Sequence, residues 1–254
     1  MELDTIYNMD CMEGMKNIPD GSIDMILCDL PYGTTENKWD VKLPLEPLWA
    51  EYKRVTKRNA AILLFSQMPF GAELIMGNRK MFRYEWILEK GCATGFLNAH
   101  KMPMRAHENI LVFYESLPTY NPQMTRGGKP YTTWHLARNG SKTYGKKIDC
   151  QTVNTDGSRF PRDVIRFNAP NNISTEKTIH PTQKPVALCE YLIRTYTNEG
   201  ETVLDNCMGS GTTAVAAINT GRRFIGFEKE KEYYDIALKR IEGAMAQTRL
   251  DFMT

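Results

Sequence analysis

Two short segments of the chain combine acidic side chains with residues that fix or free the backbone. The first is the tetrapeptide Asp29-Leu30-Pro31-Tyr32, which offers a carboxylate, a backbone carbonyl and an aromatic ring. Pro31 stiffens it, because the proline ring fixes one backbone dihedral. The carboxylate and the carbonyl are hydrogen-bond acceptors, and the ring is a stacking surface. Together these groups suit a planar amine, although a strand-ending turn with a capping Asp gives the same pattern.

The second segment begins at Asp205 and contains Gly209 and Gly211. Glycine adopts backbone angles closed to other residues and lets a ligand approach the chain closely. A helix predicted to begin near Thr212 adds free N–H groups and a positive dipole end. Glu228 follows a predicted strand about twenty residues further on, where an acidic side chain reaches ribose hydroxyls in doubly wound folds. This spacing favours a nucleoside-containing cofactor over a turn that binds nothing.

Both segments directly follow predicted strands. Short apolar runs between turn residues predict strands, and apolar residues at helical spacing predict helices. Strands are expected at 22–28, 60–66, 83–88, 110–114, 202–204 and 223–227, and helices at 45–57, 185–197, 212–220 and 230–245. The stretch between 88 and 110 is expected to be irregular. Alternating strands and helices predict an α/β fold with a doubly wound, mostly parallel sheet.

The middle of the chain has a different texture. Residues 118–175 are rich in Pro, Gly, Asn, Thr and Ser and lack long periodic segments. Such a stretch is too long for a plain loop inside a compact domain. We therefore expect one domain made of residues 1–117 and 176–254, with residues 118–175 inserted between its halves.

Composition excludes several classes of protein. The 254 residues are 42% hydrophobic and 24% charged, with a net charge of +2, which is unlike a disordered chain. The longest clean apolar run, Ala60 to Phe65, has six residues, far short of the roughly 18 that a membrane span needs. The acidic start shows no secretory signal, and the six cysteines form no Cys-x-x-Cys pair or metal-type cluster. We expect a cytoplasmic protein with reduced thiols, no metal site and no membrane partner.

Several segments, in a fixed order, resemble the β group of amino-group DNA methyltransferases. Asp29-Leu30-Pro31-Tyr32 is similar to the catalytic Asp-Pro-Pro-Tyr motif of this family, and Asp205–Gly211 is similar to its cofactor glycine motif. The other matching segments are His180–Pro185, Ile225–Glu228, Met9-Asp10 and His107–Phe113. The catalytic motif precedes the cofactor motif, and a variable segment lies between them, which is the order of the β group. The resemblance covers residues 4–116 and 176–246.

The resemblance implies a Rossmann-like enzyme that moves a methyl group from S-adenosylmethionine to the N6 amino group of a flipped-out adenine in double-stranded DNA. It makes Asp29, Leu30, Pro31 and Tyr32 catalytic. The residues that it implies for the cofactor are Asp10, Cys11, Thr182, Lys184, Asp205, Gly209, Gly211, Thr212 and Glu228. Among these, Thr182 and Lys184 are expected near the carboxylate of the cofactor. Leu30 replaces the usual proline of the family, so only its carbonyl can serve, and Cys207 stands where the family often has phenylalanine.

The middle segment then becomes a candidate target-recognition region. Residues 121–170 contain nine Lys or Arg and three Asp, a net charge of +6. Basic residues interleaved with aromatic ones suit phosphate contact and base stacking, although a solvated basic loop gives the same pattern. The cations expected to contact DNA are Arg126, Lys129, Arg138, Lys142, Lys146 and Lys147.

Other functions stay open. N4-cytosine methylation is the main alternative, although Asp29 favours adenine because the cytosine enzymes more often resemble Ser-Pro-Pro-Tyr. A catalytically inactive DNA-binding relative, an RNA or protein amide methyltransferase and an NAD-dependent oxidoreductase fit less well. By resemblance, the protein is expected to be bacterial or phage-encoded, to associate with the nucleoid through DNA, and to allow a homodimer and a partner restriction nuclease.

Overall fold

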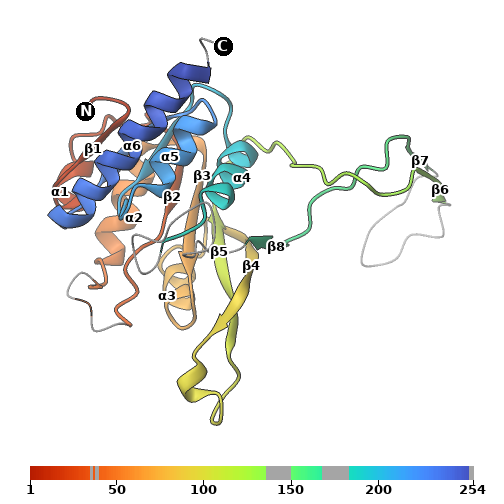
Figure 1. Cartoon of the computed structure of the whole chain (residues 1–254), viewed down its shortest axis with the longest axis horizontal. Coiled ribbons are helices and arrows are strands. Elements are labelled where there is room, and N and C mark those ends of the chain that lie inside the picture. Colours follow the sequence, from red (N-terminus) through yellow and green to blue (C-terminus); the bar gives the residue numbers. More distant parts are fainter. Residues whose placement is uncertain (35–36, 38–39, 136–149, 168–182, 252–254) are drawn as a thin grey trace. The chain divides into compact units, whose positions relative to one another are not determined.

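Figure 1 shows the computed structural model of the chain, which describes residues 1–34, 37, 40–135, 150–167 and 183–251. The chain divides into two compact units. Unit 1 consists of Met1–Asn121 and Asp163–Thr254, and unit 2 consists of Pro122–Arg162. Strand β8 (Val164–Phe167) lies within the range 118–175 assigned to the insertion, yet it belongs to unit 1, because it pairs with β4 of the main sheet.

Unit 1 is built on an eight-stranded sheet with the order β1-β10-β9-β2-β3-β5-β4-β8. The other strands are β1 (Thr5–Tyr7), β2 (Ile23–Cys28), β3 (Thr56–Ser66), β4 (Phe82–Thr94), β5 (Arg105–Phe113), β9 (Thr202–Asp205) and β10 (Arg223–Phe227). Neighbouring strands are parallel except where β5 pairs with β3 and with β4. The predicted α/β fold with a mostly parallel sheet is therefore confirmed.

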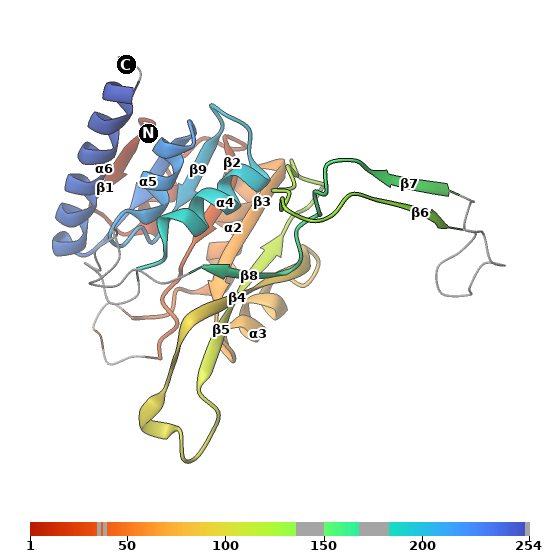
Figure 2. The ribbon, with the colours of Figure 1, turned by 45° about the vertical axis from the view of Figure 1, so that its right-hand side comes forward.

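Helices cover both faces of this sheet (Figure 2). One face carries α4 (Val186–Tyr196), α5 (Thr212–Asn219) and α6 (Lys231–Asp251), and the other carries α1 (Cys11–Met15), α2 (Leu45–Val55) and α3 (Phe70–Gly77). Successive side chains of a strand point to opposite faces. In β2, Met25 and Leu27 therefore face α4, whereas Ile26 and Cys28 face α2. This two-sided burial explains why β2 reads as a continuous apolar run.

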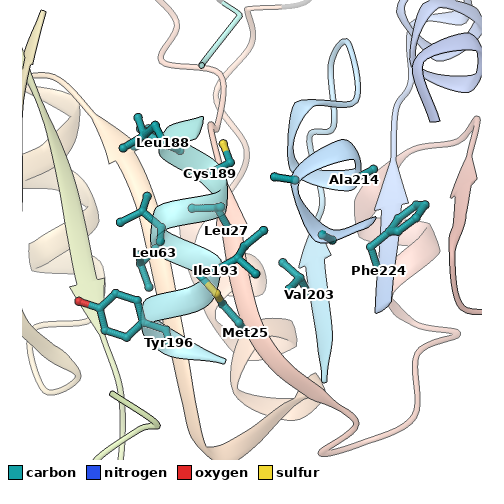
Figure 3. Packing of buried hydrophobic residues seen from close by; sticks show 14 of the residues in the cluster. Met25, Leu27, Leu63, Leu188, Cys189, Ile193, Tyr196, Val203, Ala214 and Phe224 are labelled. Atoms are coloured by element: carbon teal, nitrogen blue, oxygen red, sulfur yellow. The ribbon is translucent and has the colours of Figure 1, made fainter. Parts of the chain in front are cut away.

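The packing of α4 joins the second half of the chain to strands of the first half. Leu188, Ile193 and Tyr196 of α4 point toward the sheet, where they meet Leu63 and Met25 (Figure 3). All five side chains are buried, with at most 1% of their surface exposed. The helix thus rests on strands from the first half of the chain, although it belongs to the second.

A long hairpin replaces the irregular stretch expected between residues 88 and 110. Strands β4 and β5 pair from Phe82 and Phe113 to Thr94 and Arg105. The short helix η1 (Phe96–Asn98) lies just beyond Thr94, and the hairpin extends past the other strands of the sheet (Figure 1). The sequence concealed this hairpin because its outer residues are exposed, so no alternation of buried and polar positions marks the strands.

Unit 2 contains a small antiparallel pair, β6 (Tyr131–His135) and β7 (Cys150–Asn154). Arg159 stabilises the segment at the start of β6. Its guanidinium donates to the Lys129 carbonyl at 2.7 Å and lies over the Tyr131 ring, 4.6 Å from the ring centroid. Within the described residues of the chain, no helix is long and apolar enough to cross a membrane.

Candidate active site

The two motif segments meet at the point where the strand order of the sheet reverses. Strands β2 and β9 are neighbours, and the chain continues from β2 to β3 on one side and from β9 to β10 on the other. Asp29 directly follows β2, and Asp205 ends β9. In open α/β sheets, ligands bind outside the carboxyl ends of the strands at such a switch point.

A cavity of about 950 Å³ lies at this point, which is large for a ligand site. Most of the predicted site residues line it: Asp10, Cys11, Asp29, Leu30, Pro31, Tyr32, Lys184, Asp205, Gly209, Thr212 and Glu228. The catalytic and cofactor residues of the sequence analysis are thus brought together from both ends of the chain. Thr182 lies outside the described residues.

Asp205 is the most deeply buried carboxylate of the cavity, with 4% of its surface exposed. Burial raises its pKa from the ordinary 3.8 to about 6, although hydrogen bonds from the Thr213 hydroxyl and the Cys207 N–H stabilise the charged form. The main contributions to that pKa are burial, hydrogen bonds with Thr213, Cys207 and Cys28, and the charge of Asp29, and no Lys, Arg or His side chain is among them.

Glu228 lines the same cavity as Asp205. Its Oε2 accepts from the Gly209 N–H at 2.8 Å, and its Oε1 accepts from the Glu230 N–H at 2.8 Å. Burial raises the pKa of Glu228, while these two N–H groups stabilise its charged form. Gly209 has a φ of +55° and open space where a Cβ would lie, so a ligand can approach its backbone.

Gly211 and Asp10 have structural partners of their own. A Cβ on Gly211, whose φ is +86°, would lie 3.0 Å from the Ala237 Cβ, and Gly211 is not among the residues that line the cavity. Gly211 thus serves the contact between its turn and α6. Asp10 caps α1, since its Oδ1 accepts from the Met12 N–H at 2.9 Å, and it also lines the cavity.

Asp29 is held by two donors at the other end of the cavity. The Tyr32 hydroxyl donates to Oδ1 at 2.8 Å, and the Lys184 ammonium donates to Oδ2 at 2.5 Å. Each carboxylate oxygen has a second lone pair, so Asp29 can still accept hydrogen bonds from a ligand. The Tyr32 ring packs at a tilt on Phe70, with 5.2 Å between ring centroids.

Lys184 links Asp29 to a second half-buried carboxylate, Glu108. Its ammonium lies 3.5 Å from Glu108 Oε2, and the Lys90 ammonium lies 2.9 Å from Glu108 Oε1. Burial alone would lower the pKa of Lys184, but Asp29 and Glu108 outweigh it and raise that pKa. Burial alone would raise the pKa of Glu108, but Lys184 and Lys90 lower it. Lys184 is therefore a permanent cation of the site.

Sequence reasoning missed three residues of this end, namely Glu108, Lys90 and Asp40. Glu108 lies in a block that resembles the family, but no pattern showed its partner. Asp40 is buried and accepts from the N–H groups of Gly33 and Thr34 at 2.8 Å each, which fixes the turn after Tyr32. An aspartate eleven residues after Asp29 carries no signal of this role in the sequence.

The residues expected to contact DNA are described only in part. Arg126 and Lys129 are exposed on unit 2. Arg138, Lys142, Lys146 and Lys147 lie outside the residues that the structure describes.

Comparison with known proteins assigns the class that this fold and site define. A family model described as DNA methylase matches residues 23–239. The DNA adenine methyltransferase YhdJ of Escherichia coli (strain K12) is 30% identical over 258 residues, which cover 96% of this chain and 84% of that protein. The chain therefore belongs to the DNA methylase family.

Individual relatives agree with this assignment. The type II methyltransferase M.BglII of Bacillus subtilis is 30% identical over 95% of this chain and 69% of its own length. The crystal structure of an M1.HpyAVI–SAM complex superposes with a TM-score of 0.64 at 26% identity, covering 93% of this chain and 98% of that one. The structure of the PvuII cytosine-N4-specific DNA methyltransferase superposes with a TM-score of 0.66 at 14% identity, covering 96% of this chain and 91% of that one. This likeness concerns the fold alone.

Proposed function

We propose that the protein transfers a methyl group from S-adenosylmethionine to the N6 amino group of an adenine in double-stranded DNA. One observation carries this proposal. The acceptor groups of Asp29 and Leu30 line the same cavity as the carboxylates Asp205 and Glu228 and the open backbone of Gly209. Membership of the DNA methylase family and the relative named DNA adenine methyltransferase support the same reading.

The cofactor end suits S-adenosylmethionine by its chemistry. Asp205 is buried and Glu228 is half-buried, and burial is the main cause that raises the pKa of each carboxyl. S-adenosylmethionine carries an ammonium group and a sulfonium centre, which supply positive charge, and ribose hydroxyls, which donate hydrogen bonds to carboxylates. Its activated methyl group is the chemistry that the cofactor supplies when bound.

The protein supplies position and polarisation at the base. An adenine amino nitrogen is a poor nucleophile, because its lone pair is delocalised into the ring. Acceptance of its two hydrogens by the Asp29 carboxylate and the Leu30 carbonyl localises that lone pair, and in-line placement supplies a proximity effect. Lys184 acts as a positioning residue that orients Asp29. Transfer of the methyl group would break its bond to the sulfonium sulfur, with the electron pair left on sulfur, and Asp29 would accept the proton that the nitrogen loses, since the Lys184 ammonium is already protonated.

The base must leave the duplex to reach this cavity, so the reaction requires base flipping, with Tyr32 as the stacking residue. Unit 2 supports DNA recognition through charge. Residues 122–162 carry eight Lys or Arg and two Asp, and Tyr131, Trp134 and Phe160 are large exposed aromatics there. Arg126 and Lys129 are the described cations proposed to contact phosphates.

Cytosine N4 is the second candidate target, because the PvuII enzyme that shares this fold is named cytosine-N4-specific. A partner restriction nuclease is a further proposal, and relatives named type II methyltransferases support it. A homodimer is proposed from the family resemblance. Sedimentation of the purified protein tests the dimer, and protection of modified DNA against restriction nucleases tests for a matching partner.

The decisive experiment measures transfer of a labelled methyl group from S-adenosylmethionine to duplex DNA, followed by analysis of the modified nucleoside. N6-methyladenine is expected, whereas N4-methylcytosine would establish the alternative. The Asp29→Ala variant should lose activity by about 100-fold or more, the size typical for loss of one preorganised polar group, and should still bind the cofactor. Absence of label in DNA of varied sequence, with the cofactor bound normally, would refute the catalytic proposal.

A further inference from the structure

The end of the β4–β5 hairpin carries large apolar side chains that are mostly exposed. We call residues 95–104, which follow the last β4–β5 pair, the hairpin tip. The exposed fractions are 76% for Phe96, 93% for Leu97 and 57% for Met102. Isolated exposed apolar residues need no explanation, but several within ten residues indicate an interaction surface.

The hairpin tip is an ordered structure. Gly95 has a φ of +93°, which turns the chain sharply into η1. The N–H groups of Lys101 and Met102 then donate to the Asn98 carbonyl at 2.8 Å and 3.0 Å. The backbone is therefore preorganised while its apolar side chains stay outside, which lowers the entropic cost of binding through them.

The hairpin connects this tip to the active-site cavity. Leu88, Lys90, Cys92 and Thr94 line the cavity at every second position, so one face of β4 forms a wall of it. Thr94 pairs with Arg105, which also lines the cavity and donates to Gln67 Oε1 at 3.0 Å. Leu97 is three residues beyond Thr94, within about 10 Å along the chain. The tip therefore stands beside the cavity that holds Asp29.

The charged residues around the hairpin tip indicate which kind of partner it binds. Between Lys90 and Glu108 the chain contains Lys101, Arg105 and two histidines, and no Asp or Glu. Exposed apolar side chains flanked by cations, with no acidic residue, match DNA, whose phosphates surround stacked apolar bases. A contact between two copies of the chain would bring these like charges together.

We propose that the hairpin tip is a DNA wedge, which inserts Phe96 and Leu97 between base pairs beside the target base and helps to extrude that base into the cavity. Apolar side chains that enter a base step partly unstack it. This inference rests on the proposed function, and it adds a second DNA contact outside unit 2.

The test compares the wild-type protein with Phe96→Ser/Leu97→Ser on two duplexes that contain the identified target sequence. One duplex is fully paired, and the other has a mismatch opposite the target base, which is easier to extrude. Both side chains are exposed, so the fold should be unchanged. Methylation of the paired duplex should fall about tenfold, and the mismatched duplex should be methylated at close to the wild-type rate. Leu117→Ser is the control, because Leu117 is 78% exposed but lies outside the hairpin tip, beyond the end of β5, and it should behave as wild type.

Each other outcome is decisive. Equal loss on both duplexes, or no loss on either, would overturn the wedge. A double variant that sediments as a smaller species without DNA would show that the tip is an interface between copies of this chain, which also overturns it. Failure of the wild-type protein to methylate DNA would instead refute the proposed function, so the two failures are distinguishable.

Discussion

At the scale of single residues, Asp205 combines a functional charge with a burial penalty. A carboxyl whose pKa is raised on folding is protonated more readily in the folded than in the unfolded chain. The stability of the protein therefore falls as the pH rises from about 4 to about 6, and the loss is complete above that pH. The shift of about two pH units corresponds to roughly 3 kcal/mol. If Asp205 binds the ammonium group of the cofactor, as we propose, that ammonium offsets the penalty, and Asp205 favours function over stability.

Asp205→Asn is therefore expected to stabilise the cofactor-free protein at pH 8 and to change its stability little at pH 4. The melting temperature at pH 8 should rise by several degrees, since the amide keeps an acceptor for the Cys207 N–H without a buried charge. Affinity for S-adenosylmethionine should fall, and in the wild type it should weaken as the pH drops through about 6. Thermal unfolding and calorimetric titration at both pH values measure these effects. Equal melting temperatures with unchanged cofactor affinity would show that Asp205 does not carry this charge.

Lys184 is the residue for which family resemblance and structure suggest different roles. The resemblance places it near the cofactor carboxylate, whereas the structure bonds it to Asp29 and Glu108. Lys184→Met removes the cation but keeps most of the volume of the side chain. If Lys184 positions Asp29, kcat should fall about 10- to 100-fold, in the range seen for residues that orient a functional group, while the KM for the cofactor stays within a few-fold.

Steady-state kinetics at varied cofactor and DNA concentrations separate the two roles. A large rise in the KM for S-adenosylmethionine at unchanged kcat would assign Lys184 to the cofactor carboxylate instead. Lys90→Met is the matched control, because Lys90 contacts Glu108 and, among the described residues, forms no ion pair with Asp29. It should reduce kcat less than Lys184→Met does.

At the scale of elements, sequence patterns predict the buried parts of the fold best. Strands β2, β9 and β10 carry apolar runs bounded by turn residues, and their expected ranges differ from the observed ones by at most one residue at either end. Because such strands are buried on both faces, their composition is nearly all that defines them. The outer half of the β4–β5 hairpin lacks this constraint, so it was expected to be irregular. The short helix α3 follows from tertiary packing of Phe70 and Leu74 rather than from a long periodic pattern.

Some features of the candidate site could likewise be predicted from the sequence, and others could not. The doubly wound order alone brings Asp29 and Asp205 to one edge of the sheet, so their meeting could be predicted. The bond from Lys184 to Asp29 joins residues 155 positions apart, and no spacing rule relates them. Likewise, the packing of Gly211 on Ala237 of α6 depends on how two elements dock. A glycine motif therefore predicts a tight turn and leaves open which of its glycines faces the ligand.

At the scale of the whole molecule, the small net charge hides an uneven distribution. Residues 122–162 carry a formal charge of +6 in a chain of +2, so the rest of the protein carries −4. Such separation favours binding of the phosphate backbone through unit 2 while the catalytic unit stays mildly acidic. Backbone contacts of this kind position a protein on DNA without specifying its sequence.

If Arg126 and Lys129 contact phosphates, the variant Arg126→Gln/Lys129→Gln should bind DNA with a weaker dependence on salt. Both side chains are exposed, so the substitutions should leave the melting temperature unchanged. Each lost phosphate contact should lower the slope of log K against log salt by about 0.9, so the double variant should lose about 1.8 from the slope. The affinity should fall to a similar degree for target and non-target duplexes, since phosphates carry no sequence information. Fluorescence anisotropy over a range of salt concentrations measures both quantities. A selective loss of affinity for the target duplex, at an unchanged slope, would instead show that these two residues read base edges.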